Sequence, residues 1–278
     1  MSDEIKESNF IALGGDNGFL DCFAKGSNGE IIPRKSFIYE SNPRKPIAFR
    51  GISKAGLIFR CWEDKRDFYF MDTGYFANYV SKSNPKGAKR WHRIVKNNVQ
   101  HLGEIVDRPD DRWNRLQIEF PKLRWTGWKK QGKNILLVVP SEKPCKFYGI
   151  SAAEWTENTV KTLEQYTDRP IIIRNKAPIR SDRSMMNTIY DAMDNDVFTV
   201  VTYNSIAATE AIAYGIPAFA LAPNAASPVC LDDLSKIETP FYPDEELVRK
   251  WGCHLSYGQF SVEELIDGTA WEILNNAN

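Results

Sequence analysis

Residues 198–221, FTVVTYNSIAATEAIAYGIPAFAL, decide the fold of this chain. The pattern predicts a buried β-strand, a polar turn at Thr202-Tyr203-Asn204-Ser205, a short helix and, after a Gly-x-Pro break, a second strand. In an open α/β sheet, ligands bind where a strand ends and a helix begins, because unpaired N–H groups at the helix start favour anions. Glu210 lies inside this small, apolar helix. The stretch therefore points to a protein that holds a phosphorylated ligand.

The same alternation extends through the C-terminal half of the chain. Apolar runs and helical stretches predict, in order, a strand at 135–139, a loop through 149, a helix at 151–165, a strand at 170–174, a helix at 183–193, a strand at 198–202, a helix at 206–214, a strand at 218–221 and a last helix at 262–274. The spacing of Ser151 and Glu154, and that of Ser261 and Glu264, predicts capping boxes at two of these helices. Such a β-α-β series predicts a parallel, doubly wound sheet.

The N-terminal half has a weaker pattern. Strands are expected near 10–13, 47–52 and 68–71, and the basic stretch 86–101 reads as a loop followed by a helix. A polar, Gly-containing segment at 126–134 separates the halves. We therefore expect two domains, 1–128 and 129–278.

The bulk composition excludes several classes of protein. With 36 basic and 36 acidic side chains the net charge is zero, so the overall charge does not indicate nucleic-acid binding. The five cysteines are scattered without a CxxC pair, which fits free thiols in a reducing compartment and no zinc site. No apolar run reaches the ~18 residues of a membrane span. We expect a soluble, cytoplasmic protein with no metal and no membrane partner.

Candidate phosphate ligands surround the opening turn. The side chains of Asn204 and Ser205 can bond phosphate oxygens, although either can also simply cap the helix. Glu210 would suit ribose hydroxyls if it is buried, and the alternative is a solvent-facing glutamate. Arg174 and Lys176 follow another strand of the same sheet, where two cations suit a diphosphate, or are surface charges beside a loop.

Two residues are candidates for acid/base chemistry. Asp72 ends the strand at 68–71 beside a Gly turn, where a carboxylate can deprotonate an acceptor hydroxyl or bond its own backbone. His101 is the second candidate, because histidine is the readiest base near neutral pH. A basic-aromatic group suits a phosphate backbone with a stacked base, or is a solvated helix face; its members are Lys89, Arg90, Trp91, Arg93 and Lys96.

Taken together, these motifs resemble the donor-binding domain of GT-B glycosyltransferases. The matching residues are Val200–Thr202, Asn204-Ser205, Glu210 and Gly215-Ile216-Pro217. Roughly residues 68–274 also resemble uncharacterised phage and bacterial proteins related to these transferases, on the pieces 72–76, 92–94, 97–101, 139–141, 168–170, 202–217 and 259–271. The long Gly-rich donor loop is absent, and Pro140-Ser141 is its short equivalent.

The resemblance implies an α/β fold of two Rossmann-like domains facing a cleft, with the last helix crossing back to the first domain. It implies a metal-independent glycosyltransferase with no resident cofactor and a nucleotide-sugar, expected to be a UDP-sugar, as co-substrate. Donor contacts would come from Arg174, Lys176, Thr202, Asn204, Ser205, Glu210 and Ser141. Asp72 or His101 would act on the acceptor.

The phage relatives and the basic-aromatic group favour one acceptor. It is 5-hydroxymethylcytosine or hydroxymethyluracil in double-stranded phage DNA, modified in the host cytoplasm and flipped out of the duplex. The alternatives are a transferase acting on a surface glycan or lipid-linked sugar, a non-hydrolysing sugar-nucleotide epimerase of the same build, and a binding module without chemistry.

Overall fold

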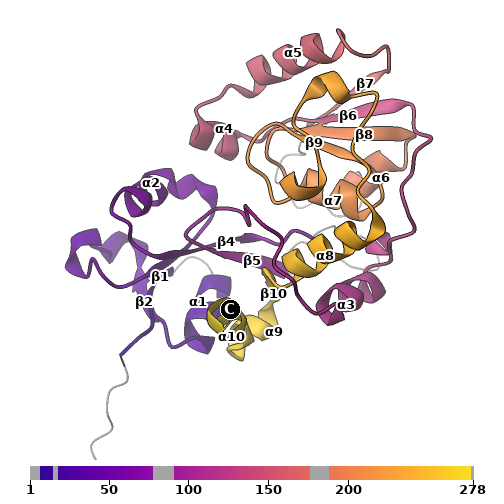
Figure 1. Ribbon diagram of the computed structural model, residues 1–278. Coiled ribbons are helices and arrows are strands. Elements are labelled where there is room, and N and C mark those ends of the chain that lie inside the picture. The colour runs from indigo at the N-terminus through magenta and orange to yellow at the C-terminus, as the bar shows by residue number, and fades with distance from the viewer. Residues whose placement is uncertain (1–6, 15–17, 78–90, 176–187, 277–278) are drawn as a thin grey trace, which may run out of the picture. The chain divides into compact units, whose positions relative to one another are not determined.

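A computed structural model describes residues 7–14, 18–77, 91–175 and 188–276 of the chain (Figure 1). The chain forms two compact units. Unit 1 comprises Met1–Gly74, Arg90–Val99 and Gly258–Asn278, and unit 2 comprises Tyr75–Lys89 and Gln100–Tyr257. The division expected between 128 and 129 falls inside unit 2, and the C-terminal segment belongs to unit 1. Each unit is built on its own β-sheet.

Unit 1 is a six-stranded sheet in the order β10-β5-β4-β3-β1-β2. Its elements are β1 (Ile11–Gly14), α1 (Gly18–Gly26), β2 (Glu30–Pro33), β3 (Ile47–Arg50), α2 (Ala55–Glu63), β4 (Phe68–Thr73), β5 (Trp91–Lys96), β10 (Gln259–Ser261), α9 (Val262–Ile266) and α10 (Thr269–Asn276). Strands β2, β1, β3 and β4 are parallel, whereas β5 runs antiparallel to β4 and β10 antiparallel to β5. Figure 1 shows α1, α9 and α10 on one face of this sheet and α2 on the other.

Aromatic side chains hold the C-terminal segment in the core of unit 1. The Phe10 ring lies 5.0 Å from that of Phe23 and 5.3 Å from that of Trp271 on α10. The predicted capping box of Ser261 and Glu264 is confirmed at the start of α9. The single helix expected over 262–274 is wrong, because Gly268 has φ +92° and ends α9.

Unit 2 is a four-stranded, wholly parallel sheet in the order β7-β6-β8-β9. Its elements are α3 (Asp111–Glu119), β6 (Asn134–Val138), α4 (Glu142–Tyr148), α5 (Ala152–Leu163), β7 (Ile171–Arg174), α6 (Ile189–Met193), β8 (Val197–Thr202), α7 (Ala207–Ala213), β9 (Ala218–Ala220) and α8 (Glu245–Ser256). In Figure 1, α5 covers one face of the sheet, and α6 and α7 cover the other. The predicted β-α-β series is confirmed.

Two segments differ from the sequence-based prediction. The loop expected through Gly149 contains α4, which accommodates Pro144 because a first-turn residue needs no N–H bond. The described part of 86–101 contains strand β5 rather than a helix. Ile94 and Val95 favour the strand, and pairing with β4 and β10 buries five of its six residues.

Within residues 7–14, 18–77, 91–175 and 188–276, no helix has the length and apolar character needed to cross a bilayer.

Candidate functional site

The turn after β8 is held in place by a buried glutamine from a distant part of unit 2. Gln100 donates from Nε2 to the carbonyl oxygen of Asn204 at 3.0 Å and accepts at Oε1 from the backbone N–H of Ala225 at 3.1 Å. Thr202 is fully buried and donates its hydroxyl to the carbonyl of Val138, so its side chain does not reach the surface. The turn therefore keeps a fixed shape through its backbone.

A second amide side chain braces the same turn. Asn224, fully buried, donates from Nδ2 to the carbonyl oxygen of Ser205 at 3.0 Å and accepts at Oδ1 from the N–H of Ala226 at 2.9 Å. The indole of Trp251 donates to the carbonyl of Ala225 at 2.8 Å. The loop and the turn thus fix one another, as a preorganised ligand site requires.

The two predicted serine ligands lie next to helix starts. Ser205 directly precedes Ile206, the N-cap of α7, and accepts at Oγ from the N–H of Ala207 at 3.2 Å, while the residue stays half-buried. Ser141 lies directly before α4, half-buried, and its side chain makes no capping hydrogen bond there. Both hydroxyls lie at the carboxyl ends of strands, where a parallel sheet binds ligands.

Glu210 is buried, and the solvent-facing alternative is wrong. Only 7% of its surface is exposed, on a helix whose seven residues are all buried. In the sheet, Val138 pairs with both Arg174 and Thr202, which places Arg174 on the same face as Thr202 and α7. Burial lowers the pKa of the Arg174 guanidinium, and the charges of Glu210 and Asp191 oppose that shift. The site thus combines a buried carboxylate with a nearby cation.

His101 lies beside the braced turn, since it follows Gln100 directly. Its backbone N–H donates to the hydroxyl of Tyr75 at 2.8 Å, and its Nδ1 lies 3.0 Å from the same oxygen. Tyr75 is fully buried, and its carbonyl accepts from the hydroxyl of Thr209 on α7 at 3.3 Å. The half-buried imidazole is therefore oriented by Tyr75 within unit 2.

A second histidine packs against this imidazole. The rings of His101 and His254 meet edge to face, with 5.7 Å between centroids. His254 accepts at Nδ1 from the N–H of Val106 at 3.3 Å. Burial lowers the pKa of His254, and the positive charge of Arg108 lowers it further. Both effects favour the neutral form of His254 beside His101.

Asp72 belongs to unit 1, at the end of β4. Its Oδ1 accepts from the N–H of Thr73 at 2.8 Å, which is the turn-forming role. Its Oδ2 lies 3.5 Å from Nη2 of Arg93, whose Nη1 donates to the carbonyl of Thr73 at 2.7 Å. The Asp72 side chain stays 31% exposed and that of Arg93 only 9%, so the arginine supports a carboxylate that remains accessible.

Two members of the basic-aromatic group, Trp91 and Arg93, do not lie on an exposed surface as the sequence suggested. Trp91 is 2% exposed and Arg93 7%, because β5 lies between β4 and β10. Trp91 therefore offers no face on which a base can stack. Lys96 is exposed and lies 3.7 Å from a carboxylate oxygen of Asp67. Lys89, Arg90 and Lys176 lie outside the described residues.

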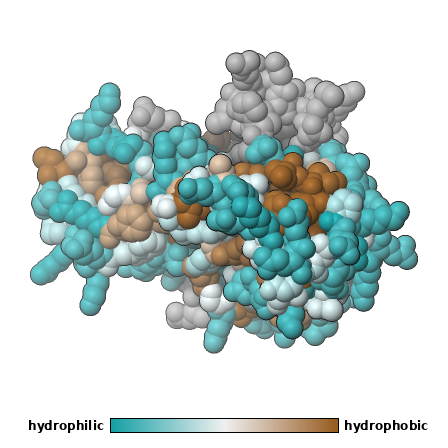
Figure 2. All heavy atoms as spheres, turned by 90° about the horizontal axis from the view of Figure 1, so that it is seen from above, coloured by the Kyte–Doolittle hydropathy of each residue, from teal (hydrophilic) through white to brown (hydrophobic). Residues whose placement is uncertain are grey.

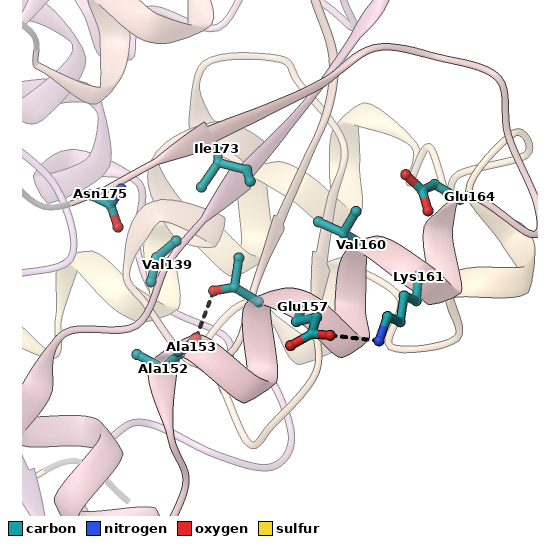
Figure 3. Close-up of a pocket in the computed structure, with 10 residues that line it drawn as sticks. Val139, Ala152, Ala153, Glu157, Val160, Lys161, Glu164, Ile173 and Asn175 are labelled. Atoms are coloured by element: carbon teal, nitrogen blue, oxygen red, sulfur yellow. Dashed lines mark hydrogen bonds and ion pairs between the residues drawn. The ribbon is translucent and has the colours of Figure 1, made fainter.

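A groove of about 650 Å³ opens on the other face of the unit 2 sheet, between α5 and β7 (Figure 3). Val139, Ile173 and Asn175 line it from the strand ends, and an ion pair of Glu157 with Lys161 lies on its α5 wall. None of the described residues predicted for the donor lines it. Figure 2 shows hydrophobic residues in separate areas of a mostly hydrophilic face.

Sequence reasoning missed Tyr75, Asn224 and His254, and gave Gln100 no role. Gln100 was visible as the neighbour of His101, whereas Asn224 reaches the turn only through folding. Among the described residues, no group of three or more His, Cys, Asp or Glu side chains is placed to hold a metal ion.

Comparison with known proteins places the fold. No family model and no curated protein matches the chain. A solved structure of Thermosulfurimonas dismutans KpsC, a β-Kdo 2,7-transferase, is similar over 98% of this chain and 100% of that chain, with 12% identity and a TM-score of 0.55. The KpsC β-Kdo 2,4-transferase of the same organism is similar over 89% and 90%, with 10% identity and a TM-score of 0.53. The predicted α/β fold class, with two Rossmann-like units of GT-B type, is confirmed by this likeness.

Proposed function

We propose that this protein is a glycosyltransferase that moves a sugar from a nucleotide-sugar donor to a hydroxyl group of a glycan. The observation that carries the proposal is the buried Glu210, within reach of the charge of Arg174 beside a braced turn. A carboxylate at the carboxyl edge of a parallel sheet is a suitable acceptor for the hydroxyl groups of a ribose or sugar. The similar solved structures, both named as Kdo transferases, support the class.

Each donor contact has a chemical role in this proposal. Arg174 neutralises charge on the departing nucleotide phosphate, together with the polar groups of Asn204 and Ser205. This cationic help lowers the barrier as the bond between the sugar and the phosphate breaks. Glu210 accepts hydrogen bonds from the donor hydroxyls and so fixes its orientation. The donor nucleotide we propose is UDP, and the chemistry uses Arg174 in place of a metal.

The acceptor hydroxyl must lose its proton during the transfer. In this proposal Asp72 receives that proton, because its carboxylate is accessible and forms an ion pair with Arg93. His101 is the second candidate, since Tyr75 orients its ring beside the donor turn. In a retaining reaction, Asp72 would position the acceptor rather than deprotonate it.

A glycan acceptor fits the described residues better than DNA. The DNA hypothesis depended on an exposed basic-aromatic surface, and two of its members, Trp91 and Arg93, are buried. Hydroxymethylated DNA stays in the test as a competing acceptor. Binding that weakens steeply with salt would favour DNA, because phosphate contacts release counterions.

The test is product analysis with the full chain. Nucleotide sugars carrying UDP, CMP, GDP or dTDP are incubated with oligosaccharides or with hydroxymethylated DNA, and the masses of all products are measured. The proposal expects an oligosaccharide heavier by one sugar and release of the nucleotide. An isomerised nucleotide sugar without any acceptor product would instead indicate an epimerase. Binding without turnover across the panel would indicate a module that has lost its chemistry.

A further inference from the structure

Arg50, at the end of β3, differs from the other arginines in the interior of unit 1. Arg66, 5% exposed, donates to three backbone carbonyls, and Arg93, 7% exposed, bonds the Thr73 carbonyl and pairs with Asp72. Arg50 is half-buried, yet no hydrogen bond or ion pair joins it to any residue in the described part of the chain. A guanidinium has five donors, and leaving them without acceptors in a partly desolvated place is costly.

The Arg50 head group is oriented by aromatic packing. Its central carbon lies 5.3 Å from the centre of the Phe19 ring on α1. Phe19 also packs against the imidazole of His92, which is fully buried, with 4.1 Å between ring centroids. A planar guanidinium against an aromatic ring loses conformational freedom before any ligand binds, while its N–H groups stay available. Phe19, which itself packs against His92, thus holds the planar guanidinium of Arg50 in position.

The place of Arg50 in the sheet is where ligands bind. β1, β3 and β4 are parallel, and Arg50 is the last residue of β3, in register with Met71 of β4. Ligands of open α/β sheets bind outside the carboxyl ends of such strands. Asp72 follows Met71 directly, so the backbones at Arg50 and Asp72 lie about 6 Å apart. Their side chains leave opposite faces of the sheet, and a short oligosaccharide crossing its edge can reach both.

We propose that Arg50 binds an anionic group of the acceptor glycan, a carboxylate or a phosphate ester on a sugar. The guanidinium fork matches either group with two parallel hydrogen bonds, whereas a neutral sugar leaves the positive charge unanswered. The inference rests on the proposed transfer to a glycan and narrows it to acidic acceptors. With its anion on Arg50, the acceptor presents a hydroxyl group across the sheet edge at Asp72.

The test is a titration of the full chain with three probes, namely galacturonate, glucose 6-phosphate and galactose. Binding is followed on the side-chain Nε–H resonance of Arg50, which is assigned by its absence in Arg50→Lys. We expect saturable shifts with one or both anionic probes, and galactose should bind about tenfold more weakly or not at all. A response to galacturonate alone identifies a carboxylate, and a response to glucose 6-phosphate alone identifies a phosphate.

Two variants and one control make the result decisive. Because the variants lack the Arg50 resonance, probe binding by wild type and variants is compared by calorimetry. Arg50→Gln should lose the preference for anionic probes, and Arg50→Lys should keep part of it, because the charge remains without the planar guanidinium. Arg34→Gln, at an exposed arginine of the same unit, should bind like the wild type. If Arg50→Gln does not fold, as judged by thermal unfolding, Arg50→Lys is used in its place. A preference for anionic probes as strong as that of the wild type would then overturn the inference.

Equal binding of all three probes by the wild type would overturn the inference, as would an unchanged preference in Arg50→Gln. Consumption of nucleotide sugars is measured on the same samples. A wild type that binds acidic sugars at Arg50 but consumes no nucleotide sugar would contradict the proposed transferase activity. It would still support the anion-binding site at Arg50.

Discussion

The carboxyl edges of the two sheets are built differently. At the edge of the unit 2 sheet, the carbonyl oxygens of Asn204 and Ser205 accept hydrogen bonds from the buried amides of Gln100 and Asn224. At the edge of the unit 1 sheet, Arg50 donates to nothing among the described residues. The rigid turn of unit 2 suits a ligand of constant shape, such as a nucleotide. The Arg50 guanidinium suits ligands that share one anionic group and differ elsewhere. This difference is the reason that we propose the donor site in unit 2 and the acceptor site in unit 1.

The largest effect is expected from Asp72→Asn in unit 1. Removing the proposed base should lower sugar transfer by about 10²–10⁴-fold, because the acceptor proton then has no carboxylate to receive it. Binding of the nucleotide sugar, measured by calorimetry, should not change. Asp64→Asn, at an exposed carboxylate of the same unit, is the control. Transfer at the wild-type rate would remove Asp72 from the mechanism.

Glu210→Gln tests the donor site that we propose in unit 2. The variant keeps one acceptor oxygen instead of two and loses the charge that strengthens hydrogen bonds to the donor hydroxyls, so donor affinity should fall about tenfold or more. The dissociation constant of the nucleotide sugar is the readout. Glu157→Gln, at an exposed helix position of unit 2, should bind as the wild type does. Equal affinity in both variants would move the donor away from α7.

Gln100→Ala should loosen the brace of the donor turn. Two buried hydrogen bonds are lost, and the carbonyl of Asn204 is left without that donor, so unit 2 should lose about 1–3 kcal/mol of stability. Urea unfolding gives the stability, and the KM for the donor should rise with it. Gln165→Ala, at an exposed position, controls for the substitution itself. A donor KM that stays constant would mean that the brace does not shape the donor site.

The smallest effect concerns pH and His254. Burial and Arg108 lower the folded-state pKa of this histidine, whereas in the unfolded chain it titrates near about 6.5. Below that pH the unfolded state binds the proton more readily, so the His254 contribution to stability is complete above about 6.5 and is lost as the pH falls. His254→Gln should make unfolding less dependent on pH between 7 and 5, as followed by circular dichroism. A wild type equally stable across this range would contradict it.

The sequence predicted the parallel core of unit 2 well because its signals are local. Continuous apolar runs predicted β6 and β8, and Ser261 with Glu264 predicted the start of α9. Helix α4 was expected to be part of a loop that follows the strand, and the charges of Trp91–Lys96 hid a strand that its neighbours on both sides bury. These errors arise because tertiary pairing outweighs local composition.

The candidate site divides in the same way. Asn204, Ser205 and Glu210 could be selected from one short stretch around a predicted turn. The residues that brace them could not, since Gln100 lies 104 positions from Asn204 and 125 from Ala225. Arg50 gave no signal in the sequence, because only the folded unit reveals that none of the described residues accepts a hydrogen bond from it.

The most direct measurement is a crystal structure of the full chain grown with the nucleotide sugar that it consumes. The account predicts the nucleotide at the carboxyl edge of the unit 2 sheet, with its phosphate within hydrogen-bond distance of Arg174 and a donor hydroxyl on Glu210. A nucleotide bound at the unit 1 edge beside Arg50, with the turn at Asn204 and Ser205 empty, would contradict it.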